Sequence, residues 1–229
     1  MTTILPNIAK VRDRIQQAAG KSGRNLSEIT LLAVSKTRPA SAIAEAHAAG
    51  LVHFGENYAQ EAQAKLDALA HLPLVWHFIG PLQSNKTRLV AERFDWLHSL
   101  DRLKLAERLQ AQRPAGLPPL NVCIEVNIDD EGSKAGIDPA GLDRLVAALA
   151  GMDRLAVRGL MVIPRAGQPP AATLASFRRT ADLLAGLRQR YPTLPLDTLS
   201  MGMSADLELA IEAGSTIVRV GTDIFGPRV

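Results

Sequence analysis

The sequence has 229 residues, 47% of them hydrophobic, which suits a globular chain with one large core rather than a disordered one. Its net charge is only +3, its basic residues are dispersed and 4% of its residues are aromatic, so a nucleic-acid partner is not expected. A single cysteine, Cys123, excludes an internal disulfide and a cysteine-cluster zinc site, and the lack of a secretion signal or membrane span predicts a cytoplasmic protein.

Short apolar runs alternate with amphipathic stretches along the chain. The runs that predict strands are Ile29–Ser35, Leu51–Phe54, Leu74–Ile79, Trp96–Ser99, Asn121–Asn127, Val157–Ile163, Thr198–Ser200 and Ile217–Val220. The stretches that predict helices between them are Ala40–Ala49, Tyr58–Leu69, Asn85–Arg93, Leu103–Gln112, Pro139–Ala150, Thr173–Arg190 and Ala205–Ala213. Apolar strands with helical crossovers form parallel sheets, so we predict an α/β fold with a single (β/α)₈ TIM-type barrel. An open doubly wound sheet is the alternative, because two predicted strands are short.

The amphipathic stretch Ile8–Ala19 precedes the first predicted strand. After the last strand only Gly221 to Val229 remain, which is too short for an eighth helix. We therefore expect an N-terminal helix to complete the outer ring and residues 1–229 to form a single domain.

Lys36 follows the first predicted strand, at the edge where barrels place their ligands. Lysine is seldom buried, so an ordinary residue at the start of a loop is one interpretation. A lysine held there by apolar neighbours can instead lose its proton and attack a carbonyl group.

Two loops near the end of the chain contain residues that are typical of an anion-binding site. After the seventh predicted strand, Gly202 lets the backbone approach a ligand, and Ser204 is a suitable N-cap for a helix whose first N–H groups would face the anion. Gly221 and Thr222 follow the eighth strand. Because barrel enzymes often bind phosphate with these two loops, the sequence predicts a phosphate site there.

Arg219 alternates with valines in the last strand, which turns its side chain into the barrel. Its guanidinium keeps its charge there and needs a partner, either Glu125 or a ligand. A small ligand with an aldehyde, a phosphate and a ring acceptor would satisfy Lys36, the two loops and Arg219 together. Pyridoxal 5′-phosphate (PLP) is such a molecule.

Several segments, spread in order over nearly the whole chain, carry a family resemblance. They are AVSKT (33–37), FGENY (54–58), HFIGPLQSNK (77–86), GLM (159–161), LSMGMSAD (199–206), GSTIVRVG (214–221) and IFG (224–226). With them the chain resembles the pyridoxal phosphate homeostasis proteins, which are single-domain barrels related to the alanine racemase barrel.

The resemblance implies that Lys36 carries PLP as a Schiff base, with Asn57 near the ring hydroxyl and Arg219 at the ring nitrogen. From the residue alone, Asn57 also suits a helix cap before Tyr58. The residues that the resemblance implies around the phosphate are Ser200, Gly202, Met203, Ser204, Gly221 and Thr222.

We predict a non-catalytic PLP-binding protein of intracellular vitamin B6 homeostasis, acting as a monomer that passes its cofactor transiently to apo enzymes. A PLP-dependent racemase or lyase is the alternative, and a Schiff-base aldolase leaves Arg219 unexplained. The charge of Arg219 opposes protonation of the ring nitrogen, which weakens the ring as an electron sink. A racemase also needs a second proton donor, and the chain has only Tyr58 and Tyr191 as tyrosines.

Two further groups of residues contain side chains that can bind metal ions. His53, His77 and His98 fall in or beside neighbouring strands, but without a supporting carboxylate pattern we expect hydrogen-bonded core residues. The acidic segment 127–134 lacks calcium-loop spacing and is expected to lie over the barrel mouth.

Overall fold

The computed structural model describes residues 3–131 and 135–227. Within them, eight parallel strands close into a barrel in chain order, with β8 paired to β1. The strands are β1 (Thr30–Val34), β2 (His53–Glu56), β3 (Val75–Phe78), β4 (Trp96–Leu100), β5 (Leu120–Glu125), β6 (Leu155–Met161), β7 (Thr198–Ser200) and β8 (Ile217–Val220). The predicted (β/α)₈ barrel is confirmed.

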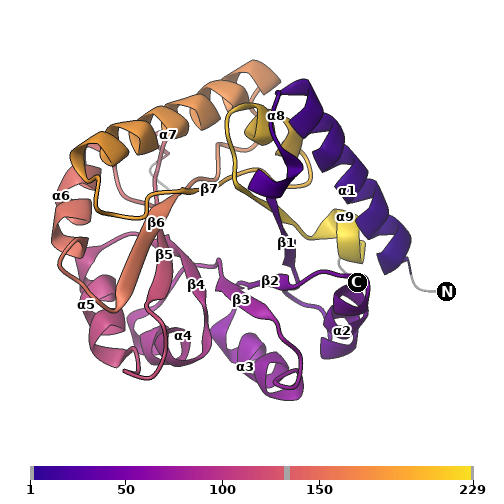
Figure 1. The fold of residues 1–229 in the computed structure, drawn as a ribbon, viewed down its shortest axis with the longest axis horizontal. Coiled ribbons are helices and arrows are strands. Elements are labelled where there is room, and N and C mark those ends of the chain that lie inside the picture. Colours follow the sequence, from indigo (N-terminus) through magenta and orange to yellow (C-terminus); the bar gives the residue numbers. More distant parts are fainter. Residues whose placement is uncertain (1–2, 132–134, 228–229) are drawn as a thin grey trace.

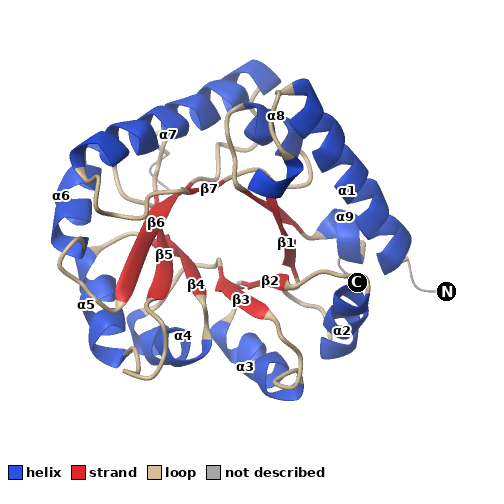
Figure 2. Cartoon of the chain, in the orientation of Figure 1, coloured by secondary structure: helices blue, strands red, loops and turns tan. Residues whose placement is uncertain are grey.

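The helices form a ring around the strands (Figure 2). They are α1 (Ile4–Lys21), α2 (Ala40–Ala48), α3 (Ala59–Ala68), α4 (Thr87–Arg93), α5 (Leu103–Gln112), α6 (Pro139–Leu149), α7 (Pro170–Arg190), α8 (Leu207–Glu212) and α9 (Thr222–Phe225), with 3₁₀ turns η1 (Leu26–Glu28) and η2 (Ser84–Lys86). No helix in the described part of the chain is long and apolar enough to cross a membrane.

The N-terminal helix α1 occupies the place in the ring that the sequence predicted for it. Its buried face, formed by Ile8, Val11 and Ile15, packs on the core. Figure 1 shows α1 beside α9, although they lie at opposite ends of the chain, and Asn7 Nδ2 donates to the Ile224 carbonyl at 3.1 Å. The single turn α9 was not predicted, because its four residues are too few to show helical periodicity.

The second strand begins at His53 rather than at Leu51, two residues later than predicted. Leu51 donates its backbone N–H to Ala46 in α2 and is buried beneath that helix. The apolar run therefore starts in the helix–strand turn before it enters the sheet, and periodicity alone does not separate the two.

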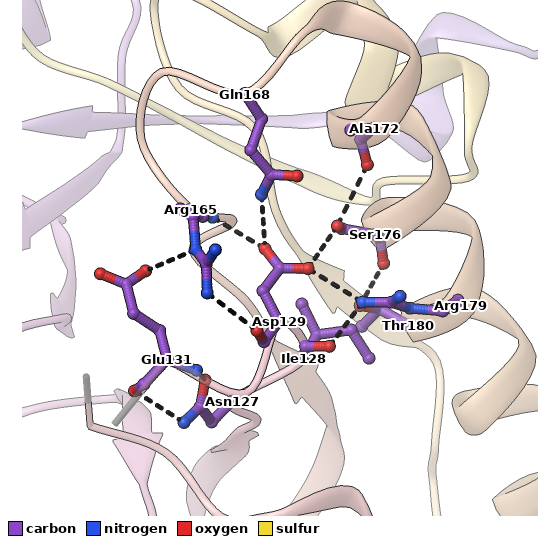
Figure 3. Close-up of polar contacts among 10 residues, drawn as sticks. All are labelled: Asn127, Ile128, Asp129, Glu131, Arg165, Gln168, Ala172, Ser176, Arg179 and Thr180. Carbon is purple, nitrogen blue, oxygen red and sulfur yellow. Dashed lines mark hydrogen bonds and ion pairs between the residues drawn. The ribbon is translucent and has the colours of Figure 1, made fainter. Parts of the chain in front are cut away.

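At the carboxyl ends of the strands, which we call the barrel mouth, Asp129 ties two loops together (Figure 3). Its carboxylate accepts from the Arg165 N–H (2.8 Å), Gln168 (2.8 Å), the Ser176 hydroxyl (2.5 Å) and Arg179 (2.9 Å). Burial alone would raise the pKa of Asp129, but these bonds and the charge of Arg179 bring it below its usual value. The loop expected over the mouth is thus anchored at residue 129, while Gly132, Ser133 and Lys134 lie outside the described residues.

Candidate functional site

Three adjacent strands bring the principal predicted residues to one end of the barrel. Lys36 lies two residues beyond β1, and Asn57 directly follows β2. Arg219 lies within β8, where it pairs with Leu32 of β1. Because β1 stands between β2 and β8, Lys36, Asn57 and Arg219 converge at the barrel mouth.

The turn that carries the half-buried Lys36 is held from both sides by helix α3. Lys65 Nζ donates to the Ser35 carbonyl at 2.8 Å, and the Thr37 N–H donates to Glu61 Oε1 at 2.6 Å. Thr37 has a φ of +63°, a conformation that is uncommon for a β-branched residue. The two anchors therefore fix the backbone immediately before and after Lys36.

Lys65 is the centre of an ionic cluster that also contains the buried Glu56 and the half-buried Glu61. Its ammonium lies 2.8 Å from Glu56 Oε1 and 2.5 Å from Glu61 Oε1. The Ser35 hydroxyl donates to the same Glu56 oxygen at 2.5 Å. Burial raises the pKa of Glu56, whereas Lys65 and Ser35 act in the opposite direction. Sequence reasoning missed this cluster; its only signal was a lysine between Ala62 and Leu66 on the buried face of α3.

Asn57 offers an unused acceptor. Its Oδ1 is buried and accepts no hydrogen bond from the described residues. Helix α3 begins at Ala59 with Tyr58 in the N-cap position and no side-chain cap, so the interpretation of Asn57 as a helix cap is wrong. A buried polar atom without a partner is costly, which suits a site completed by a ligand donor.

Arg219 is a buried cation, 5% exposed. Its Nη1 donates to the Ser200 carbonyl (2.5 Å) and hydroxyl (2.8 Å), and its Nη2 donates to the Val162 carbonyl (3.0 Å). No ion pair joins Arg219 to Glu125, the alternative partner, within the part of the chain that is described. Burial lowers the pKa of Arg219 to about 10, which leaves the guanidinium charged at neutral pH.

The loop after β7 differs from its predicted form. Helix α8 begins at Leu207 with Asp206 in the N-cap position, so the prediction that Ser204 is the N-cap is wrong. Asp206 accepts the Met203 N–H at 2.6 Å and closes a turn before the helix, a competing role that aspartate often takes. The Met203 N–H is therefore not open to an anion in this arrangement.

In both loops, close packing against the protein leaves little room for a side chain at the glycine position. Gly202 has a φ of +94°, and a Cβ there would lie 2.5 Å from the Cβ of Ala210. A Cβ on Gly221 would lie 3.1 Å from the Val34 carbonyl oxygen. Thr222 is exposed at the start of α9, whereas the Ser200 hydroxyl is engaged inside the barrel.

Comparisons with known proteins place the chain in a family. The sequence model of "Alanine racemase, N-terminal domain" matches residues 7–229. Two proteins named pyridoxal phosphate homeostasis protein are each 58% identical over the whole chain, which covers 97% of the one from Pseudomonas aeruginosa and 98% of the one from Escherichia coli K12.

Solved structures agree with this assignment. PipY of Synechococcus elongatus, solved with PLP bound, matches with a TM-score of 0.84 and 43% identity, over 93% of this chain and 100% of that chain. The alanine racemase of Corynebacterium glutamicum, at 19% identity and a TM-score of 0.68 over 97% of this chain and 62% of that one, shows a likeness in fold alone. The chain belongs to the alanine racemase N-terminal domain family and, within it, to the pyridoxal phosphate homeostasis proteins.

Proposed function

We propose that this protein binds PLP through a Schiff base on Lys36 and holds it in reserve for vitamin B6 homeostasis. The observation that carries the proposal is the convergence of Lys36, Asn57 and Arg219 at the mouth of a closed barrel. The name of its relatives at 58% identity and the PLP bound to PipY support it.

The residues at the mouth fit this cofactor. The unpartnered Asn57 Oδ1 would accept from the ring hydroxyl, and Arg219 would meet the ring nitrogen. The loops that carry Gly202 and Gly221 would hold the phosphate, with the Ser204 and Thr222 hydroxyls as donors. When bound, PLP supplies an aldehyde that condenses with an amine and a ring that withdraws electrons.

We favour a carrier over a racemase or lyase. The buried charge of Arg219 would oppose a proton on the ring nitrogen, and such a proton is what makes the ring a strong electron sink. Tyr191 donates its hydroxyl to the Asp143 carbonyl in the outer ring, and Tyr58 is 56% exposed. Neither tyrosine is held inside the barrel as a second proton donor.

We further propose that the protein is a single-domain cytoplasmic monomer that passes PLP to apo enzymes and binds no nucleic acid. Basic residues on the outer helices support the last point, since Arg88 pairs with Glu92 and Arg93 with Asp67. Paired charges of this kind do not form a continuous basic face.

The phosphate loops can be tested by comparing two ligands. Ser204→Ala combined with Thr222→Val is expected to weaken PLP about tenfold or more, because charge-assisted hydrogen bonds are lost. Pyridoxal, which lacks the phosphate, should bind the variant and the native protein equally in spectroscopic titrations. Thr193→Val, at an exposed threonine before β7, is the control; equal weakening of both ligands would place the phosphate elsewhere.

The carrier proposal predicts that the PLP-loaded protein exchanges the α-proton of amino acids for deuterium no faster than free PLP does. The reason is the weak electron sink that the charge of Arg219 would impose. Proton NMR of alanine in deuterium oxide measures the exchange, with a PLP-loaded alanine racemase as the positive control. Rapid racemisation by this protein would make it an enzyme and overturn the proposal.

A further inference from the structure

Five polar side chains form a continuous row of hydrogen bonds inside the barrel, which we call the histidine chain. Its members are His53, His77, His98, Ser200 and Arg219. His53 Nδ1 lies 3.0 Å from His77 Nε2, and His77 Nδ1 lies 2.9 Å from His98 Nε2. His98 Nδ1 lies 2.7 Å from Ser200 Oγ, which accepts from Arg219 Nη1 at 2.8 Å.

The histidine chain runs from the floor of the barrel to its mouth. His53 is the first residue of β2 and lines a pocket of about 580 Å³ between α1 and the amino ends of β1 and β2. Ser200 is the last residue of β7. His77, His98 and Ser200 are fully buried, so water does not compete for the links between them.

His77 and His98 are hydrogen-bonded core residues, as the sequence predicted, and the half-buried His53 is hydrogen-bonded to His77. In the described part of the chain, no group of three or more His, Cys, Asp or Glu side chains could hold a metal ion. Trp96 stacks on the His77 ring at 5.4 Å with a 12° tilt, and the Arg158 guanidinium lies 5.1 Å from the Trp96 ring. This stack fixes the plane of the central imidazole.

The donor-only guanidinium of Arg219 and the need of the buried Ser200 hydrogen for an acceptor together set the direction of the bonds in the row. A guanidinium only donates, so Ser200 Oγ accepts from Arg219. His98 Nδ1 is the other partner of this buried oxygen among the described residues, so the arrangement that leaves no buried hydrogen without an acceptor directs the Ser200 hydrogen to His98 Nδ1. A neutral imidazole has one donor and one acceptor nitrogen. His98 therefore carries its hydrogen on Nε2 and donates to His77 Nδ1, and His77 in turn donates from Nε2 to His53 Nδ1.

The charge state of the imidazoles agrees with this order. Burial, together with the charge of Arg219, lowers the pKa of His98 to about 3. Burial and the neighbouring histidines lower the pKa of His77 well below its usual value, and burial lowers that of His53 while Asp95 opposes the shift. At neutral pH the row thus contains neutral rings beside one permanent cation.

We propose that His53, His77 and His98 are positioning residues for Arg219. All three are neutral imidazoles with their hydrogen on Nε2, and His98 holds the Ser200 hydroxyl so that its oxygen accepts from the guanidinium. The row thereby fixes the buried guanidinium of Arg219. That Arg219 in turn meets the ring of PLP rests on the proposed function.

The tautomers can be measured without any ligand. Two-bond ¹⁵N–¹H correlation spectra of the ¹⁵N-labelled apo protein identify which nitrogen of each imidazole carries the hydrogen. We expect Nε2–H for His53, His77 and His98 at neutral pH. An Nδ1–H tautomer or a charged ring at His98 would overturn the proposal, whether or not the protein binds PLP.

Two variants at opposite ends of the row test whether Arg219 imposes the direction. Ser200→Ala removes the donor to His98 Nδ1, so His98 is expected to populate the Nδ1–H tautomer as well. His53→Ala removes only the last acceptor, and His98 should keep its Nε2–H form. Circular dichroism confirms folding; the same response of His98 to both variants would contradict the proposal.

Two substitutions of His98 test whether the histidine chain affects the binding of PLP. The amide oxygen of His98→Asn occupies the place of Nδ1 and still accepts from Ser200, whereas the longer side chain of His98→Gln reaches only toward His77. We expect the PLP dissociation constant to rise less than about threefold in the first and about tenfold in the second, as for one lost hydrogen bond. The absorption maximum of bound PLP should shift only in His98→Gln. Equal losses would reduce His98 to a packing residue and refute the positioning role, while failure of the native protein to bind PLP would refute the proposed function alone.

Discussion

Replacing Lys36 with alanine is expected to abolish covalent attachment of PLP while leaving the barrel folded. Lys36 is the residue that α3 anchors at the mouth, through the Ser35 carbonyl and the Thr37 N–H. Borohydride reduction of the PLP-loaded native protein, followed by peptide mapping, should place the label on Lys36. The variant should take up no label above the level of a nonspecifically modified protein.

The second lysine near this turn provides an internal comparison. Lys65 is 5% exposed, and its nitrogen donates to three oxygen atoms of the protein. It is therefore not available to a ligand. Lys104→Ala, at an exposed lysine of α5, is the matched control and should label as the native protein does. A label found mainly on Lys65 or another lysine would contradict the assignment of Lys36.

The fold was predictable because each strand is covered on both faces and reads as an apolar run. Strands β7 and β8 have the predicted bounds despite their shortness, since turn residues flank them on both sides. The errors lie where a local hydrogen bond competes with periodicity. Leu51 lies in the turn after α2, where its N–H bonds to the Ala46 carbonyl, and Asp206 rather than Ser204 is the N-cap of α8.

The position of a site residue was predictable where the local sequence pattern alone determines it. Alternation in β8 turned Arg219 inward, and the end of β1 located Lys36. The Lys65 cluster was not predictable in this way, because it depends on how α3 packs across β1 and β2. The order of the histidine chain likewise depends on the register of a closed barrel, which periodicity does not give.

Lys65→Met is expected to destabilise the fold by about 3–5 kcal/mol at neutral pH, because it leaves a buried carboxylate without its cation. Glu56 is fully buried, and its Oε2 already has no partner among the described residues. Urea denaturation at pH 7 measures the loss. Lys21→Met, at an exposed lysine at the end of α1, is the control and should change the free energy of unfolding little.

The loss of stability in Lys65→Met should also depend on pH. Burial raises the pKa of Glu56 in the folded protein, and removal of Lys65 should raise it further. The folded state then binds a proton that the unfolded state has released, so stability falls as pH rises above the unfolded pKa of about 4.3. Below that pH both states are protonated at Glu56, and the difference between variant and native protein should shrink.

Adding Glu56→Gln to Lys65→Met separates the buried charge from the loss of packing. A neutral amide no longer needs the cation, so the double variant should regain more than half of the lost stability at pH 7. Its stability should also lose most of the pH dependence of the single variant. If Glu56→Gln restores nothing, the loss in Lys65→Met comes from the released Ser35 carbonyl and Glu61 contacts rather than from Glu56. The labelling of Lys36 by PLP and borohydride would then report on the turn. It should be slower in Lys65→Met, because the bond from Lys65 to the Ser35 carbonyl is lost.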